Sequence, residues 1–500
     1  MRTLSSRTGE GGRLARGALA AGKPRGAWHV PHLAGGLIFL SVATQAAKGA
    51  NLDAGDAASL VVAYLIGAVA VRLMVRHNRG TALRAYGAFA MLAASVLVVG
   101  TWYAGSYGTL DPAWMIDRWV PRDDIGLFEW FVWPWARSES FSLADGQTNA
   151  PLFWFVNARL QQWLAVPSDV PKPLLGHFVN VTVGSLTLAL TVAAAGELAP
   201  DERGRGSASE RAFVVGMWSP WLIVASVVFI RDIWVYAVFA ATAFAGLRLR
   251  RRPLAVRLPL AIVVGVGLAT IMAGLRIEMV ALVVVLLATT GFLMDARSKR
   301  SARYGAVVAV VLVGANLLMA SRDRMVDRAI VYSALGAESS ASDLGTVGSI
   351  VGSSLVARGA FQTAWLPLQP LPKVAIAPGS LYSLGKTLAP AWLMGVAVLV
   401  FARRPGRERL LRGPKPELWL MGWVMAVAVA IGFTSAETRH FLCVIPVVIA
   451  LAGQSALGEA SDGTSRSAVK HAIAAAGMTL IGSILITAAL WGPTALFRGT

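Results

Sequence analysis

The sequence is poor in charge and has almost no cysteine. Charged residues make up 15% of the 500 residues and hydrophobic residues 56%, a balance that excludes an ordinary soluble globule and indicates an integral membrane protein. The single cysteine, Cys443, lies in an apolar run. An intramolecular disulfide and a cysteine-based metal cluster are therefore excluded, and we expect Cys443 to serve in packing.

Several catalytic signatures are also missing. The chain has no Walker-type glycine-rich loop, no His-Glu-x-x-His motif and no Gly-x-Ser-x-Gly elbow. The apolar segments hold almost no ionisable residue near their middle, whereas ion-coupled transporters usually need such residues there. His177 and Asn180 are the main polar side chains of their apolar segment, and we expect both near its outer end.

What is present is a series of apolar segments long enough to cross a membrane. A span needs roughly 20 apolar residues, and about 17 at the short end. The sequence therefore predicts an all-α, polytopic membrane protein with about 13 spans. They are expected near 33–47, 57–74, 83–104, 174–196, 213–230, 233–247, 258–275, 279–294, 304–320, 388–402, 418–434, 440–457 and 471–492. Because several are short, the pair within 213–247 could instead include a re-entrant or strongly tilted segment.

Charge is sorted between the two sets of connections that alternate along these spans. One set holds about 30 of the 46 Lys and Arg residues and about 10 of the 27 acids, which the positive-inside rule makes cytoplasmic. The N-terminus is then cytoplasmic, in the inner (cytoplasmic) membrane of a cell. The basic residues set topology and meet anionic lipid headgroups, so nucleic-acid binding is not expected.

The organisation predicted is one membrane domain between two tails. Residues 1–32 form a basic cytoplasmic tail that we expect to be disordered, 33–492 form the helical domain, and 493–500 form a short C-terminal tail. The first span has a second interpretation as a cleaved leader, because a basic region and a short apolar stretch precede small residues. Cleavage would leave the sidedness of the other spans unchanged.

Two connections on the extracytoplasmic side, 105–173 and 321–387, are too long to be simple connectors. Loops of this length usually carry function. In the first, Asn149-Ala-Pro151 predicts a helix start, and the helix that follows places Leu152, Val156, Leu160 and Trp163 on one stripe, which is typical of a helix in the membrane interface. Both loops combine apolar and charged residues and suit lids over a site at the membrane surface.

Three very short turns on the same side carry an arginine beside a carboxylate. They are Arg231-Asp232, Arg276 with Glu278, and Glu437-Thr-Arg439-His440. An arginine there has no topological benefit. Each turn has two interpretations: a salt bridge that closes a helical hairpin, or a cation that binds an anionic group beside an acid or imidazole that transfers protons.

The long loops add further candidates. Asp117, Asp123 and Asp124 could each supply a general base, although most acids in an exposed loop are simply solvated. The adjacent carboxylates Asp123-Asp124 also allow a divalent cation, which is a weak metal signal, and no metal ligand or other cofactor is assigned. Arg322 opens the second long loop and is a further candidate for binding phosphate.

The chemistry that fits these residues is transfer from a lipid-linked sugar. An enzyme on that face has no nucleotide sugar, so an activated substrate must arrive through the membrane, as polyprenyl-phosphate sugars do. A carboxylate or histidine would take the proton of the acceptor hydroxyl, and arginines would hold the departing phosphate. The phosphate-binding candidates are Arg231, Arg276, Arg322 and Arg439; the acid–base candidates are Asp117, Asp123, Asp124, Asp232, Glu437 and His440.

Four segments carry a resemblance to a known group. They are Phe229-Ile-Arg-Asp-Ile-Trp234, Gly274-Leu-Arg276, the proline-rich Leu366–Pro372, and Glu437-Thr-Arg-His-Phe-Leu-Cys-Val-Ile-Pro446. In these short motifs, over about 100–457, the chain resembles the bacterial polysaccharide polymerases (O-antigen polymerase and EpsG-like) and, more loosely, the GT-C membrane glycosyltransferases. It departs from the GT-C pattern, because its acidic loop follows the third span and not the first. The resemblance implies a polytopic glycosyltransferase and leaves the base unassigned.

The function expected is therefore polymerisation or transfer of polyprenyl-linked glycan at the extracytoplasmic face. The partners expected are that glycan, membrane lipid and other envelope glycan-assembly membrane proteins. A lipid-linked glycan flippase would use the same arginines without chemistry. A non-catalytic scaffold of an envelope-assembly complex would need the charged turns only as salt bridges.

Overall fold

The computed structural model describes eleven parts of the chain. They are residues 32–37, 54–106, 132–138, 151–166, 172, 174–199, 202–294, 381–401, 416–434, 438–454 and 464–491. Every regular element among them is helical. The predicted span at 304–320 and most of the two long loops lie outside the described residues.

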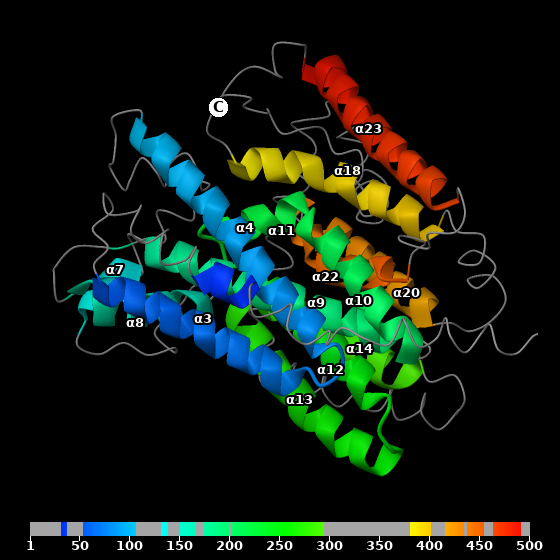
Figure 1. The fold of residues 1–500 in the computed structure, drawn as a ribbon, viewed down its shortest axis with the longest axis horizontal. Helices are drawn as coiled ribbons and strands as arrows, with labels where there is room; N and C mark the ends of the chain where they lie inside the picture. Colours follow the sequence, from blue (N-terminus) through cyan, green and yellow to red (C-terminus); the bar gives the residue numbers. More distant parts are fainter. Residues whose placement is uncertain are drawn as a thin grey trace, which may run out of the picture.

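The helices follow one another along the chain from α3 to α23 (Figure 1). They are α3 (Ala54–Met74), α4 (Arg79–Ser106), α7 (Trp133–Arg137), α8 (Pro151–Leu164), α9 (Leu174–Leu198), α10 (Glu202–Met217), α11 (Pro220–Val227), α12 (Asp232–Leu249), α13 (Leu254–Leu275), η5 (Ile277–Met279), α14 (Val280–Ala288), η6 (Thr289–Leu293), α18 (Leu381–Phe401), α20 (Pro416–Thr434), α21 (Thr438–Phe441), η8 (Leu442–Val444), α22 (Ile445–Ala452) and α23 (Thr464–Trp491).

Helix α9 is the centre of the bundle. It packs against α3, α4, α10, α11, α12 and α22, and nearly all of its residues are buried. Glycines allow this close approach: a Cβ at Gly184 would lie 2.6 Å from the Cβ of Ser226, and one at Gly176 would lie 2.0 Å from the ring of Phe229. Because a packed interior has no spare volume, these positions require glycine.

The described helices are those of a membrane-embedded protein. Five of them, α3, α4, α9, α12 and α13, are long and apolar enough to cross a membrane, and shorter apolar helices lie at Ile277–Leu293, Leu388–Val400, Trp419–Ala428, Leu442–Ala452 and Val469–Gly482. Helices α3, α13 and α23 expose rows of large apolar side chains, for example Ile66, Val263 and Met478. A soluble protein rarely exposes so much apolar surface, whereas lipid covers it readily.

The span predicted at 213–230 is not one continuous helix. Residues 202–217 form α10, which begins inside the predicted 197–212 loop, and α11 starts afresh at Pro220. Ser219 is extended, with ψ of 106°, because the residue before a proline is sterically driven out of the helical region. Proline then occupies the first turn of α11, where its missing N–H is not needed.

Two other predicted spans are irregular. The segment 279–294 runs from the 3-10 turn η5 through α14 into the π-helical turn η6, and the segment predicted at 440–457 is divided into α21, η8 and α22 and ends its helix at Ala452. Pro446 lies at the start of α22. A proline cannot donate to the preceding turn, which explains the break at η8.

Polar contacts separate into two ends of the bundle. At one end, called the Glu197 end, Arg251 pairs with Glu197 at 2.9 Å, Asn78 bonds Ser209, and Arg211 bonds the Gly453 carbonyl. Apart from Gly453, which lies within the predicted span 440–457, these residues belong to connections predicted on the basic side. At the other end, called the Asp232 end, Asp232 pairs with Arg276, and both residues belong to connections predicted on the opposite side. The ion pair of each end thus joins connections that the charge pattern predicts on the same side.

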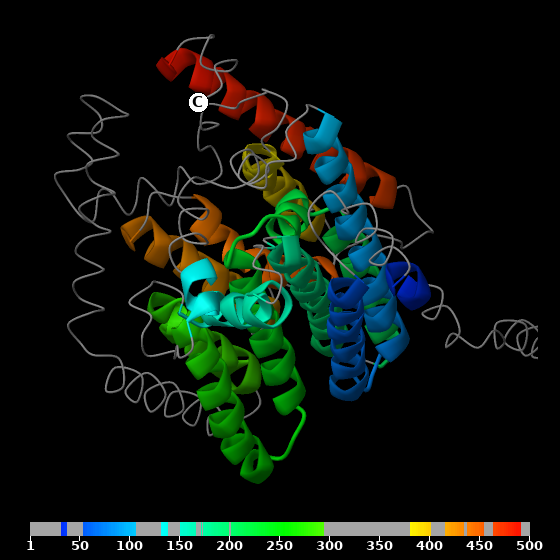
Figure 2. The same cartoon turned by 90° about the vertical axis from the view of Figure 1, so that its left-hand side faces the viewer.

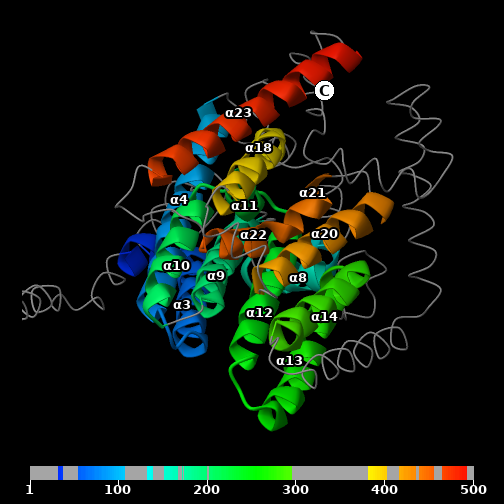
Figure 3. The same ribbon diagram turned by 90° about the vertical axis from the view of Figure 1, so that its right-hand side faces the viewer.

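The short helices α7 and α8 and the long helices α18 and α23 complete the arrangement. In Figure 2, α7 and α8 lie across the ends of longer helices, and α8 contacts α9 and α13. Helices α18 and α23 pack against each other (Figure 3).

We expect Gly184→Ala to destabilise the bundle. The new methyl would overlap Ser226, and overpacking of a core costs roughly 1–3 kcal/mol. Gly267→Ala is the matched control, because nothing lies within 4 Å of its Cβ position on α13, and alanine is the better helix former by about 0.5–1 kcal/mol. Thermal unfolding in detergent measures both. Equal melting temperatures for the two variants would contradict the proposed packing of α9.

Candidate functional site

The turn between α11 and α12 is held in place by α9. The Nδ2 of Asn180 donates to the carbonyls of Val228 and Ile230 at 2.8 and 3.0 Å, and its Oδ1 accepts from the indole N–H of Trp234 at 2.8 Å. One turn earlier, His177 Nδ1 lies 2.6 Å from the Val227 carbonyl. Because buried carbonyls need partners, these two polar side chains allow the chain to leave helical geometry inside an apolar body.

The turn carries Arg231 and Asp232 and is covered by α8. Phe153 of α8 stacks against Phe229 and Trp234, with ring centroids 5.2 and 5.8 Å apart. Arg231 precedes the first residue of α12, and Asp232 occupies that first position, where the helix dipole favours a carboxylate.

Helix α8 starts at Pro151 as the sequence predicted. The residues buried inside the bundle are Phe153, Trp154, Asn157, Ala158 and Gln161. The predicted stripe of Leu152, Val156, Leu160 and Trp163 is less buried, with Trp163 71% exposed. Aromatic packing on Phe229 and Trp234 sets the buried side of α8, while Leu152 and Leu160 of the stripe are partly buried against the core.

Two of the three predicted turns meet in a buried ion pair. Arg276 follows α13, and its Nη2 lies 3.0 Å from Oδ1 of Asp232. Both side chains are almost fully buried, at 4% and 6% exposure. The Nη1 of the same guanidinium lies 3.8 Å from the carboxylate of Glu278, which is 39% exposed. Asp232 thus fixes the position of the Arg276 guanidinium. The other side of this guanidinium faces the exposed carboxylate of Glu278.

The segment that follows the third turn packs against α12. Both η8, which contains Cys443, and α22 contact this helix. The hydroxyl of Tyr236, one turn along α12, accepts from Trp221 Nε1 at 2.6 Å. Cys443 is buried as predicted, and the α21–α22 segment joins the Asp232 end as the sequence suggested.

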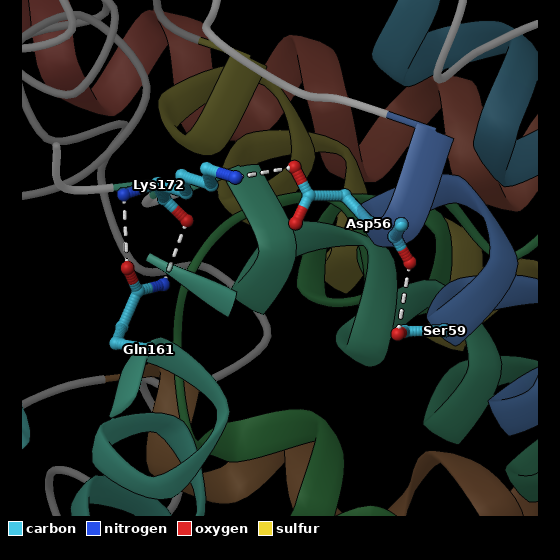
Figure 4. Close-up of polar contacts among 5 residues, drawn as sticks. Asp56, Ser59, Gln161 and Lys172 are labelled. Atoms are coloured by element: carbon cyan, nitrogen blue, oxygen red, sulfur yellow. Dashed lines mark hydrogen bonds and ion pairs between the residues drawn. The ribbon is translucent and has the colours of Figure 1, made fainter. Parts of the chain in front are cut away.

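A second buried ion pair was not foreseen from the sequence (Figure 4). Lys172 Nζ lies 2.8 Å from Asp56 Oδ2, and the side chains are 2% and 1% exposed. Gln161 holds the backbone of Lys172 from both sides, accepting from its N–H at 2.9 Å and donating to its carbonyl at 2.7 Å. The pair ties the end of the first long loop to the start of α3.

The predicted site residues are distributed as follows. Asp232 and Arg276 are paired, Arg231 is half-buried beside them, and His440 is half-buried in α21. Arg439 belongs to α21, although its side chain is not among those described. Asp117, Asp123, Asp124, Arg322 and Glu437 lie outside the described residues. The described residues contain no group of three or more His, Cys, Asp or Glu side chains that could hold a metal ion.

The arrangement can bind and orient anions and move protons. It combines a half-buried arginine, a half-buried imidazole and an exposed carboxylate beside a neutral, buried ion pair. Comparison of the chain with protein-family models, with curated proteins and with solved structures finds no match.

Replacing Asn180 should destabilise the protein through the turn. Asn180→Leu leaves the Ile230 carbonyl and the Trp234 indole without the partner they have now, and each unsatisfied buried group costs about 1–3 kcal/mol. Thr191→Val is the control on the same helix, because the Thr191 hydroxyl donates only to the Thr187 carbonyl of its own helix. Thermal unfolding in detergent should show a clear loss for Asn180→Leu alone; a loss shared equally with the control would contradict this account.

The Asp56–Lys172 pair can be tested by a double-mutant cycle. Lys172→Met should cost about 3–5 kcal/mol, because it leaves a buried carboxylate without its cation, and Asp56→Leu combined with Lys172→Met should recover much of that loss. Glu210→Gln is the comparison, since the Arg84–Glu210 pair is partly exposed and such pairs contribute about 0–1 kcal/mol. Additive losses in the double variant would show that the two side chains do not interact.

Proposed function

We propose that this chain is a membrane glycosyltransferase or polysaccharide polymerase that acts on polyprenyl-phosphate-linked glycan at the extracytoplasmic face of the inner membrane. The observation that carries the proposal is the ion pair Asp232–Arg276, which joins two arginine-bearing turns that lie far apart along the chain. The segment that follows the third turn, η8 and α22, contacts α12, the helix that begins at Asp232.

The roles follow from exposure and pairing. Arg276 is buried and neutralised by Asp232, so it suits positioning better than direct binding of phosphate. Arg231 is half-buried and fits the role of phosphate binding, together with Arg439 of α21. Among the described acids of the Asp232 end, Asp56 and Asp232 are buried in ion pairs, and Glu278 is the exposed one.

Glu278 is therefore our choice for the general base, with His440 as the alternative. In the reaction, the acceptor hydroxyl oxygen forms a bond to the anomeric carbon and its proton passes to the carboxylate. The bond from the anomeric carbon to the phosphate oxygen breaks, and polyprenyl phosphate leaves with the electron pair and is stabilised by arginine.

The test is the amount of glycan polymer and of lipid-linked units in cells whose own copy is replaced by Glu278→Gln or Arg231→Ala. We expect polymer to fall by about 100-fold or more for Glu278→Gln, which is the usual loss for a general base, with short lipid-linked units building up in the outer leaflet. Glu210→Gln is the matched control, because Glu210 is an equally accessible glutamate at the opposite end, and it should keep normal polymer.

The amount of each variant in the membrane is measured in parallel. Build-up of short lipid-linked units in the inner leaflet would contradict the enzyme proposal and indicate a flippase. Normal polymer in both Glu278→Gln and Arg231→Ala would overturn the site and return the chain to a scaffold role.

A further inference from the structure

Arginines from two distant segments gather at the Glu197 end. Arg248, in the last turn of α12, donates from its guanidinium to the carbonyl of Met74 at the end of α3. Arg76 lies two positions after Met74, and Arg252 lies four positions after Arg248. The contact between Arg248 and Met74 therefore brings the three arginines into one region of the surface.

The nearby carboxylate does not balance this charge. Glu197 is already paired with another arginine: its Oε2 lies 2.9 Å from Nε of Arg251, and its carbonyl accepts from the same guanidinium at 2.9 Å. The charge of this carboxylate is thus matched by Arg251. Like charges held together in this way favour a bound anion.

The surface next to the arginines is apolar and exposed. Along α3, Ile66, Val69 and Leu73 are 64%, 53% and 73% exposed, and Leu73 directly precedes the Met74 that Arg248 contacts. Arg76 and Arg252 are themselves exposed. A ligand bound at this place would contact the arginines at the membrane surface and the apolar side chains of α3 next to them.

We infer that Arg76, Arg248 and Arg252 form a binding site for the phosphate of an anionic phospholipid, whose acyl chain lies along the exposed face of α3. Both halves of the ligand have a matching surface, since arginine binds phosphate and apolar side chains accept hydrocarbon. The site lies at the opposite end from Asp232 and is independent of the proposed glycosyl transfer. The charge bias places it on the cytoplasmic leaflet, where anionic lipids are found.

The test is thermal unfolding of the detergent-purified full-length protein during titration with phosphatidylglycerol or phosphatidylcholine. Phosphatidylglycerol should raise the melting temperature more, and Arg76→Gln/Arg252→Gln should weaken its apparent affinity by about tenfold or more. Arg159→Gln/Lys470→Gln removes the same charge from other helices and should keep the affinity. Both arginines of the test pair are exposed, so the melting temperature without lipid should not change.

Each other outcome overturns the inference. Equal stabilisation by the two lipids, or an equal loss of affinity in both double variants, would reduce the cluster to nonspecific surface charge. A melting-temperature rise of the same size with inorganic phosphate alone would identify a site for soluble anions without a lipid chain. A lower melting temperature of Arg76→Gln/Arg252→Gln without lipid would identify the arginines as structural contacts.

Discussion

The Asp232 end depends on one constraint: backbone carbonyls freed inside an apolar body must find donors. The chain leaves helical geometry between α11 and α12, and Asn180 supplies donors to Val228 and Ile230. That contact fixes the start of α12 and so the position of Asp232. Asp232 then holds Arg276, and Arg276 faces Glu278. Charged groups at this end are thus placed by a neutral amide whose own cost of burial is offset by three hydrogen bonds.

The burial of α9 is what makes Asn180 effective. A helix surrounded on all sides needs small residues where neighbours approach, and Gly176 and Gly184 flank Asn180 on the chain. Close approach of Phe229 and Ser226 brings α11 within reach of a short side chain. A larger residue at either glycine would move α11 outward and lengthen the hydrogen bonds of Asn180, so packing and polar satisfaction are coupled at this turn.

The sequence predicted the helical class and a membrane-embedded chain, because hydrophobic length acts locally along the chain. Five of the predicted spans correspond to described helices that are long and apolar enough to cross a membrane. It also placed His177 and Asn180 at one end of their helix. Pro220 is itself a visible sequence signal for the break that precedes it, yet hydropathy alone predicts one continuous span over 213–230. The buried face of α8 carries no such signal, since it is set by Phe229 and Trp234, which lie far away in the sequence.

Pairings between distant segments were the least predictable part of the site. Asp56 and Lys172 are 116 positions apart, and each appears alone as an ordinary residue near a span boundary. The sequence predicts Arg276 as a phosphate-binding residue in a turn with Glu278, because periodicity does not reveal that Asp232 faces the Arg276 guanidinium. Patterns along a chain identify which groups share an end of the bundle, but tertiary packing decides which charges neutralise one another.

The two ends use charge in different ways. At the Asp232 end, Asp232 and Asp56 are each paired with a buried cation, and Glu278 is exposed next to the Asp232–Arg276 pair. At the Glu197 end, cations exceed acids and remain exposed, where they meet mobile anions of the membrane surface. A buried ion pair can hold a neighbouring exposed carboxylate in a defined place, which chemistry requires, whereas a cluster of exposed cations can only attract anions. This difference is why we assign catalysis to the first end and lipid binding to the second.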